Sequence, residues 1–206
     1  MIEFFFDCSS PWTYLAFRGV QPMAAGIKTS IVWRPVLVGG IFNTVNKGIY
    51  TAREDMNSPK NRYVLKDLQD CASAAGLSIV FPPKIFPVNS VKAMRGCIWI
   101  AQDTEASSKF LAFVEAVFAA YFSRQEDISQ DAVLAEICSQ TGIDAERFMA
   151  GIAQSDIKEK LKANTDEAIR RGAFGTPTLF VGDDMYFGND RLQLVRSAAL
   201  RAIDAN

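Results

Sequence analysis

The chain of 206 residues contains no histidine. This absence excludes every mechanism that needs an imidazole, including a Ser-His-Asp triad, a Cys-His pair, a histidine general base and a histidine-ligated zinc site. Chemistry in this protein has to come from hydroxyls, thiols, carboxylates, amines, backbone dipoles or a bound group.

The sequence also lacks long apolar runs and an excess of basic residues. No stretch approaches the roughly 20 apolar residues that span a bilayer, and the N-terminus has neither the basic flank nor the cleavage site of a signal peptide. We therefore expect a cytoplasmic protein with no membrane partner. The 22 basic and 23 acidic residues give a net charge of −1, and without a basic stripe we expect no nucleic-acid partner.

Cysteine pairs of the redox or metal-binding type are missing as well. The four cysteines are widely spaced and form no Cys-x-x-Cys motif, which predicts neither a zinc knuckle nor a dithiol centre: Cys8, Cys71, Cys97 and Cys138. We expect free and mostly buried thiols, and no metal site.

The elements that the sequence does specify follow a recognisable order. An apolar run at residues 2–7 predicts a buried strand, and Ser10-Pro11 is typical of a helix start. A second strand is expected at residues 29–38, and residues 38–57 read as a loop with about one helical turn. Helices are predicted at residues 58–75, 90–102, 105–123, 130–140, 144–154 and 156–171, then a hairpin at 178–187 and a last helix from 190 capped by Asn189.

This order predicts an α/β protein with a thioredoxin-like fold. The sheet domain would comprise residues 1–57 and 172–206, and an all-helical insertion at residues 58–171 would divide it. Because no repeat or low-complexity linker interrupts the chain, we expect residues 1–206 to form one unit.

Ser10 is the first candidate for a functional role. In the plainer interpretation it only caps the helix that begins at Pro11. A helix N-terminus also carries unpaired amides and a partial positive charge, so a hydroxyl there is placed to hydrogen-bond an anion such as a thiolate. Ser10 is a poor covalent nucleophile because no imidazole is present to take its proton.

Two later motifs each have a plain and a functional interpretation. Pro177 after Thr176 is either a simple strand entry or the proline that, in thioredoxin-like folds, exposes the preceding backbone to a peptide-like ligand. Asn189 and Asp190 either begin the last helix or also bind the charged end of an amino-acid moiety.

Four segments together resemble the 2-hydroxychromene-2-carboxylate isomerase family, which is related to kappa-class glutathione transferases within the DsbA-like thioredoxin group. They are Phe6-Asp7-Cys8-Ser9-Ser10-Pro11-Trp12-Thr13-Tyr14-Leu15, Arg34-Pro35 to Gly39-Gly40, Ala173-Phe174-Gly175-Thr176-Pro177 and Phe187-Gly188-Asn189-Asp190-Arg191-Leu192. The resemblance runs over nearly the whole chain in the same order, and it implies a DsbA-like sheet domain with a helical insertion.

The resemblance implies that glutathione is the cofactor. DsbA-like oxidoreductases carry Cys-Pro-x-Cys at the helix start, where this chain has Ser10-Pro11-Trp12-Thr13, so neither redox position is a thiol. Ser10 matches the serine beside the glutathione sulfur. The resemblance further implies backbone pairing at Thr176-Pro177, binding of the γ-glutamyl end by Asn189 and Asp190, and contacts from Asn46 and from Lys60, the latter to the glycyl carboxylate; Asn43 competes with Asn46.

The implied activity is a glutathione-dependent isomerisation in aromatic hydrocarbon catabolism, interconverting 2-hydroxychromene-2-carboxylate and trans-o-hydroxybenzylidenepyruvate. Reversible thiolate addition to an enone permits the required bond rotation. Candidates to bind the carboxylate of this small aromatic substrate are Lys60, Lys84, Lys92 and Arg95.

Other functions stay open. They are a kappa-class-like transferase or reductase acting on another electrophile, or a non-catalytic glutathione- or peptide-binding module. A disulfide oxidoreductase is disfavoured because Ser10 and Thr13 cannot form a disulfide. We expect a homodimer, as the relatives form.

Overall fold

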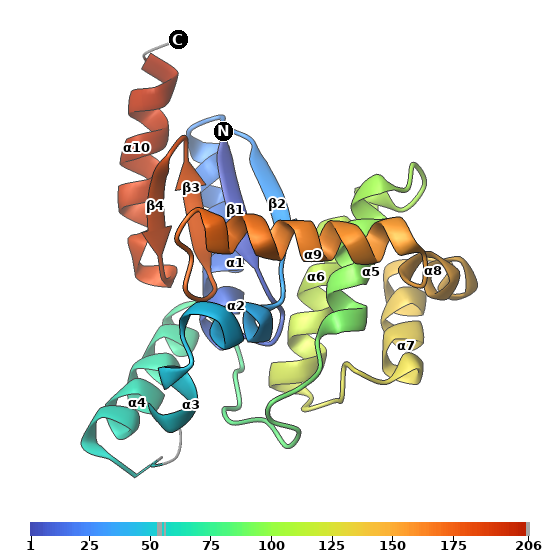
Figure 1. Cartoon of the computed structure of the whole chain (residues 1–206), viewed down its shortest axis with the longest axis horizontal. Helices are drawn as coiled ribbons and strands as arrows, with labels where there is room; N and C mark the ends of the chain where they lie inside the picture. Colours follow the sequence, from blue (N-terminus) through green and yellow to red (C-terminus); the bar gives the residue numbers. More distant parts are fainter. Residues whose placement is uncertain (53–54, 56, 205–206) are drawn as a thin grey trace.

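The computed structural model describes residues 1–52, 55 and 57–204. Four short strands form one mixed sheet in the order β2-β1-β3-β4 (Figure 1). The strands are β1 (Ile2–Phe6), β2 (Ile31–Pro35), β3 (Thr178–Val181) and β4 (Asp184–Phe187). β1 pairs in parallel with β2 and antiparallel with β3, and β3 pairs antiparallel with β4. Strands from the two ends of the chain therefore meet in one sheet.

Alternation along β1 divides the core between the two faces of the sheet. Phe4 and Phe6 pack in the larger core with α1 (Pro11–Gly26) and α10 (Leu192–Asp204). Phe5 points to the opposite face, where it packs with Phe180 and with Ala168 of α9 (Ser155–Arg170). The sheet is thus covered by helices on both faces.

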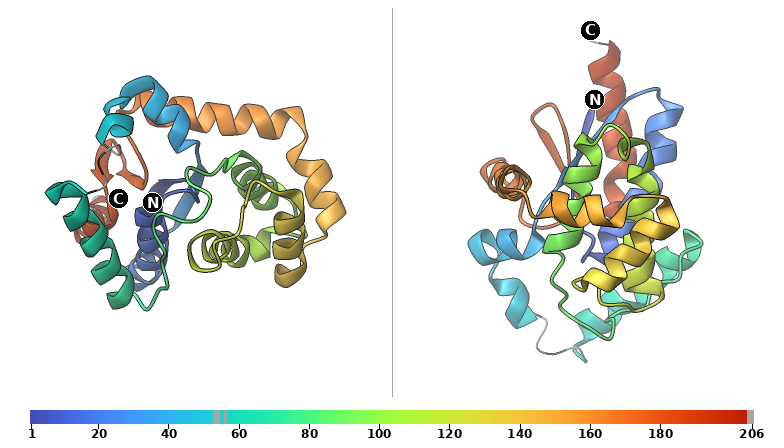
Figure 2. Two further views of the ribbon diagram at one scale, coloured as in Figure 1. Left: turned by 90° about the horizontal axis from the view of Figure 1, so that it is seen from below. Right: turned by 90° about the vertical axis from the view of Figure 1, so that its right-hand side faces the viewer.

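The remaining helices lie beside one end of this sheet. Figure 2 shows α4 on one side and the group α5–α8 on the other, with α9 running from that group back to the sheet. Their bounds are α2 (Val38–Val45), α3 (Gly48–Ala52), α4 (Pro59–Ala74), α5 (Val91–Gln102), α6 (Phe110–Phe118), α7 (Asp131–Thr141) and α8 (Ala145–Ile152). Short 3-10 turns occupy Ser107–Lys109 and Asn189–Arg191, and Ala119–Ser123 is a π-helix.

The fold prediction is confirmed: the chain is a thioredoxin-like, DsbA-like α/β protein with a sheet domain and a helical insertion. The exact domain boundaries at residues 57–58 and 171–172 stay predictions. The hairpin and most insertion helices also lie where the sequence placed them, within a few residues.

The loop prediction for residues 38–57 was wrong over most of its length, because α2 and α3 occupy it; residues 53, 54 and 56 lie outside the described residues. Two glycines in the first turn of α2 lower its intrinsic helix propensity. Tertiary packing overrides this preference, since Ile41 is fully buried and a Cβ at Gly40 would lie 3.3 Å from Thr165 of α9. Gly40 is therefore needed for the close approach of α2 and α9.

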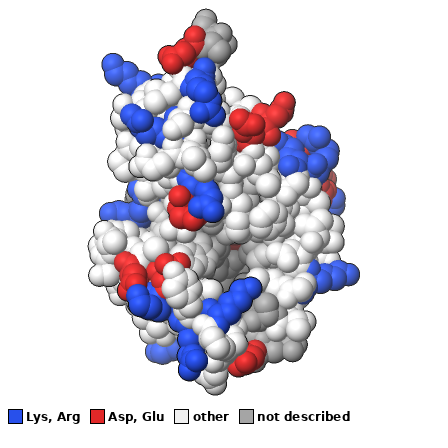
Figure 3. All heavy atoms as spheres, turned by 90° about the vertical axis from the view of Figure 1, so that its left-hand side faces the viewer, with Lys and Arg blue, Asp and Glu red and all other residues white. Residues whose placement is uncertain are grey.

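Two further expectations concern the surface and the thiols. In the part of the chain that the structure describes, no helix combines the length and apolarity required to cross a bilayer. Basic and acidic side chains are interspersed on the face shown in Figure 3. All four cysteines are free, and three of them, Cys8, Cys97 and Cys138, are buried while Cys71 is half-buried, which confirms the thiol prediction.

Candidate functional site

Ser10 joins the start of α1 to the loop before β3. Its hydroxyl oxygen accepts a hydrogen bond from the Thr13 N–H at 3.3 Å, so Ser10 caps the helix as predicted. The same hydroxyl donates to the backbone carbonyl of Thr176 at 3.1 Å, and the peptide bond between Thr176 and Pro177 is cis. Two motifs 166 residues apart in the sequence thus form one unit beside the positive end of α1.

Asp7 directly follows β1 and is a second polar group beside Ser10 and Thr176. The side chain is buried, and its two oxygens accept hydrogen bonds from the Ser9 N–H at 2.9 Å and the Val38 N–H at 2.8 Å. The hydroxyl of Ser90 also hydrogen-bonds to it. Burial raises the pKa of Asp7 above its usual 3.8, and these hydrogen bonds offset only part of that effect. Asp7 therefore ties β1 to the starts of both α2 and α5.

A pocket of about 690 Å³ opens in front of Ser10 and Asp7. It lies between the start of α1, helices α2 and α3, the start of α4, the loop before α5 and the loop before β3. Eight of its lining residues are aromatic: Trp12, Phe42, Tyr50, Phe81, Phe86, Tyr121, Phe174 and Phe187. Among the described residues that line it, Asp7 and Lys60 alone are charged. We refer to this hollow as the Ser10 pocket.

Four of the predicted site residues line the Ser10 pocket: Ser10, Asn46, Lys60 and Thr176. The side-chain amide of Asn46 donates to the carbonyl of Phe174 at 3.0 Å. Asn43 lies outside the lining and accepts a hydrogen bond from the Tyr50 hydroxyl at 2.9 Å. The structure therefore brings Asn46, and not Asn43, to the pocket, while the roles assigned to these residues stay predictions.

The other three predicted residues do not line this pocket. Pro177 is buried, and its carbonyl accepts a hydrogen bond from the Gly188 N–H at 3.1 Å. Asn189 hydrogen-bonds with Cys71 of α4, and Asp190 forms an ion pair with Arg191. The prediction that Asn189 caps the last helix was wrong, because it lies inside a 3-10 turn that precedes α10.

The four cations considered for a substrate carboxylate are also separated by the structure. Lys60 lines the Ser10 pocket, whereas Lys84 does not. Lys92 pairs with Asp131 at 2.7 Å, and Arg95 lines a different hollow, next to α9. Lys60 is the one of these four that faces the pocket.

Sequence reasoning missed Asp7 as a site residue, and it missed the aromatic wall. Asp7 had a local signal, since it is a carboxyl group placed directly after the run Phe4-Phe5-Phe6 and three residues before the helix-capping serine. The aromatic residues had none, because they come from seven separate segments that only the fold brings together.

The polar groups around Ser10 fit a peptide-like ligand that carries a thiolate. Thr176 Oγ1 is buried in the pocket wall without a hydrogen-bond partner among the described residues, and such groups are normally satisfied by a ligand or water. The Ser10 hydroxyl and the amides at the start of α1 favour negative charge. Cys8 cannot supply the thiolate, because burial and the neighbouring Cys97 raise its pKa well above its usual value.

Comparison with known proteins agrees with this geometry. The DSBA-like thioredoxin domain matches residues 1–199. The chain is 27% identical to a 2-hydroxychromene-2-carboxylate isomerase of Pseudomonas putida, over 100% of this chain and 97% of that protein. It is 26% identical to glutathione S-transferase kappa 1 of Homo sapiens, over 94% and 88% of the two chains. A solved structure of 2-hydroxychromene-2-carboxylate isomerase superposes with a TM-score of 0.79 at 26% identity, covering 100% and 97%.

Proposed function

Because this chain belongs to the DSBA-like thioredoxin domain family, we propose that it is a glutathione-dependent isomerase that interconverts 2-hydroxychromene-2-carboxylate and trans-o-hydroxybenzylidenepyruvate. The relatives support the broader class of enzyme, an isomerase or a glutathione-related transferase, and not a particular substrate. Aromatic hydrocarbon catabolism would be its context.

The observation that carries the proposal is the hydrogen bond from the Ser10 hydroxyl to the Thr176 carbonyl at the mouth of an aromatic pocket. In this chain the helix start reads Ser10-Pro11-Trp12-Thr13. A serine at the first redox position can stabilise a thiolate but cannot form a disulfide. This favours a role with a bound thiol over thiol-disulfide exchange.

Glutathione, when bound, supplies the thiolate that adds reversibly to an enone. The N-terminal amides of α1 and the helix dipole would lower the pKa of that thiol. Ser10 would add a hydrogen bond when its single proton turns from the Thr176 carbonyl to the sulfur. Thr176 would pair with the tripeptide through its backbone, and its buried Oγ1 gains a partner. Asn46 and Lys60 would bind the tripeptide from α2 and α4, and Asn189 and Asp190 would hold its γ-glutamyl end.

The substrate class follows from the composition of the pocket wall. Eight of the residues that line the 690 Å³ volume are aromatic, which suits a planar apolar ring. The only described cation in the lining is Lys60, and it is exposed without an ion-pair partner among the described residues. A small aromatic substrate with a single carboxylate matches this wall, and Lys60 is left to bind either that carboxylate or the glycyl carboxylate of glutathione.

The test is an isomerisation assay on 2-hydroxychromene-2-carboxylate, with and without glutathione, followed by the absorbance of the ring-opened product. We expect an acceleration that depends on both the protein and glutathione. If the rate with both equals the rate with glutathione alone, this protein is not the isomerase.

A kappa-class-like transferase is the second candidate, because relatives of both types align over almost the whole chain. It predicts conjugation of glutathione to an electrophile instead of isomerisation of the substrate.

Asn46→Ala and Asn43→Ala form a matched pair for the glutathione site that both functions share. We expect weaker glutathione binding in the first variant and unchanged binding in the second; equal affinities would remove Asn46 from the site.

A further inference from the structure

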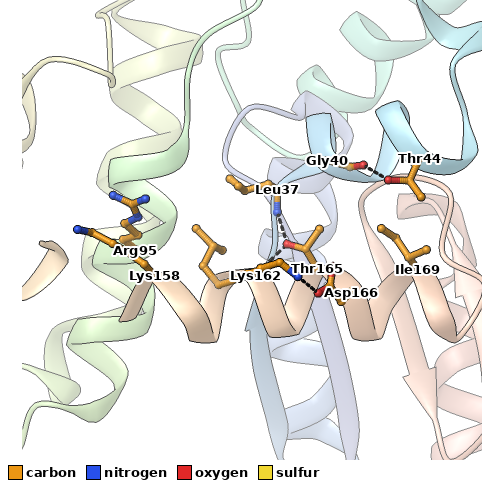
Figure 4. Close-up of a pocket in the computed structure, with 10 residues that line it drawn as sticks. Leu37, Gly40, Thr44, Arg95, Lys158, Lys162, Thr165, Asp166 and Ile169 are labelled. Atoms are coloured by element: carbon orange, nitrogen blue, oxygen red, sulfur yellow. Dashed lines mark hydrogen bonds and ion pairs between the residues drawn. The ribbon is translucent and has the colours of Figure 1, made fainter. Parts of the chain in front are cut away.

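A second hollow, of about 310 Å³, lies on the other side of the first turn of α2 (Figure 4). Its wall comes from α2 and α9, with Arg95 of α5 at one end. Leu37, Leu161 and Ile169 give it an apolar floor. The proposed isomerisation does not use this hollow, which we call the α9 pocket.

The α9 pocket contains two cations without an anionic partner. Arg95 and Lys158 line it, and neither forms an ion pair with a carboxylate in the part of the chain that the structure describes. The Nε of Arg95 is buried and has no hydrogen-bond partner there. A buried donor that lacks an acceptor is destabilising, more so when it is charged, so this end of the pocket is organised for an acceptor that the described residues do not supply.

The other polar groups of the α9 pocket are already engaged (Figure 4). Lys162 pairs with Asp166, so their charges cancel. The Thr165 hydroxyl accepts from the Leu37 N–H at 3.1 Å and donates to the Leu161 carbonyl at 2.9 Å. The Thr44 hydroxyl donates to the Gly40 carbonyl at 2.9 Å. Arg95 and Lys158 are therefore the groups left to recognise a ligand.

We propose that the α9 pocket binds a small organic carboxylate with an apolar ring or branched chain. An arginine side chain receives a carboxylate with paired hydrogen bonds, and Lys158 adds a second positive charge. The apolar portion would lie on Leu161, about one helical turn from Lys158. A volume near 300 Å³ is at the lower end for small-molecule sites and fits a ligand the size of benzoate. This site does not depend on glutathione.

The test is a titration of the full chain with benzoate, followed by the side-chain Nε–H signal of Arg95 in nitrogen-15 NMR; the signal is assigned by its loss in Arg95→Gln. We expect this signal to shift saturably. Lys158→Gln should weaken binding about tenfold, whereas Lys160→Gln, an exposed lysine of the same helix outside the lining, should leave it unchanged. Lys60→Gln should also leave the shift unchanged, which separates this site from the Ser10 pocket.

Three outcomes would overturn the proposal. They are an Arg95 signal that does not respond to benzoate, equal affinities in Lys158→Gln and Lys160→Gln, and equal binding of the neutral analogue benzamide. Because Lys158 is exposed, its replacement leaves the fold intact, and if Arg95→Gln is unstable the signal is assigned by its loss in Arg95→Lys, which keeps the charge. A failed isomerisation assay would leave all of these results unaffected.

Discussion

Two carboxyl groups near the two ends of strand β1 have opposite surroundings: Glu3 lies within the strand, and Asp7 directly follows it. Glu3 accepts from Arg34 at 2.9 Å and from Arg171 at 2.6 Å, and Arg171 also lies 3.7 Å from the ring centre of Phe180. Asp7 has no such cation in its hydrogen-bond set and is held by backbone N–H groups and hydroxyls.

The pKa values of the two groups move in opposite directions. Burial alone would raise the pKa of Glu3, but the hydrogen bonds from Arg171 and Arg34 outweigh it, so the pKa falls below its usual 4.5. Burial raises the pKa of Asp7, because its hydrogen bonds do not compensate in full. One end of β1 is therefore arranged for stability, and the other end is arranged for the Ser10 pocket.

The largest effect is expected at Asp7. Asp7→Ala leaves the part-buried N–H groups of Ser9 and Val38 without acceptors, at up to about 1–3 kcal/mol each. We expect the free energy of unfolding in urea to fall by about 2–4 kcal/mol, and glutathione binding to weaken at least tenfold because the start of α2 loses its anchor.

Asp7→Asn keeps one acceptor oxygen and should lie between the wild type and Asp7→Ala in both measurements. Asp183→Ala, in the exposed turn of the hairpin, is the matched control. Unchanged binding in a folded Asp7→Ala protein would show that Asp7 does not position the pocket.

A smaller effect, limited to stability, is expected at Glu3. Glu3→Gln removes the charge that two partly buried arginines contact, and should lower the free energy of unfolding near neutral pH by about 1–2 kcal/mol. Glutathione binding and isomerisation should not change, because Glu3 lies outside the Ser10 pocket. Loss of binding in this variant would contradict the division between the two ends of β1.

The pH dependence of the Glu3 effect has a definite sign. A lowered pKa means that ionised Glu3 contributes stability above the unfolded value of about 4.5, and that this contribution is lost as pH falls through the folded value. The stability gap between wild type and Glu3→Gln should therefore close in acid. A gap that widens below pH 4.5 would reverse the assignment.

The smallest perturbation is a titration of the unmodified protein. Carbon-13 NMR of the side-chain carboxyl groups should place the midpoint of Asp7 above 3.8 and that of Glu3 below 4.5. Two unshifted midpoints would mean that burial and arginine pairing do not differ between the ends of β1 as the structure indicates.

The sequence predicted the parts of this protein that depend on local signals. Ser10 before Pro11 marks a helix start by capping chemistry alone, and the hairpin at Gly182 is a turn between two apolar runs. Helix α2 was missed because its two glycines argue against a helix, and tertiary contacts, including those with α9 and Asp7, stabilise it.

The site was predictable where motifs fall on fixed positions of the fold, and unpredictable where tertiary packing decides. Ser10 and Thr176 meet because both flank strands of the central pair β1 and β3. No sequence signal predicts that the pKa of Glu3 falls while that of Asp7 rises, because Arg171 and Val38 contact them from distant segments. The same holds for Arg95, which no local pattern places beside α9.

The role given to Ser10 is to stabilise a glutathione thiolate. A pH titration of thiolate absorbance, with glutathione bound, measures this effect. In the wild type, we predict a thiol pKa below that of free glutathione. In Ser10→Ala, it should rise by about one to two units, the equivalent of one hydrogen bond to a charged group, with a smaller change in glutathione affinity. Identical thiolate titrations in the two proteins would show that Ser10 does not stabilise the thiolate.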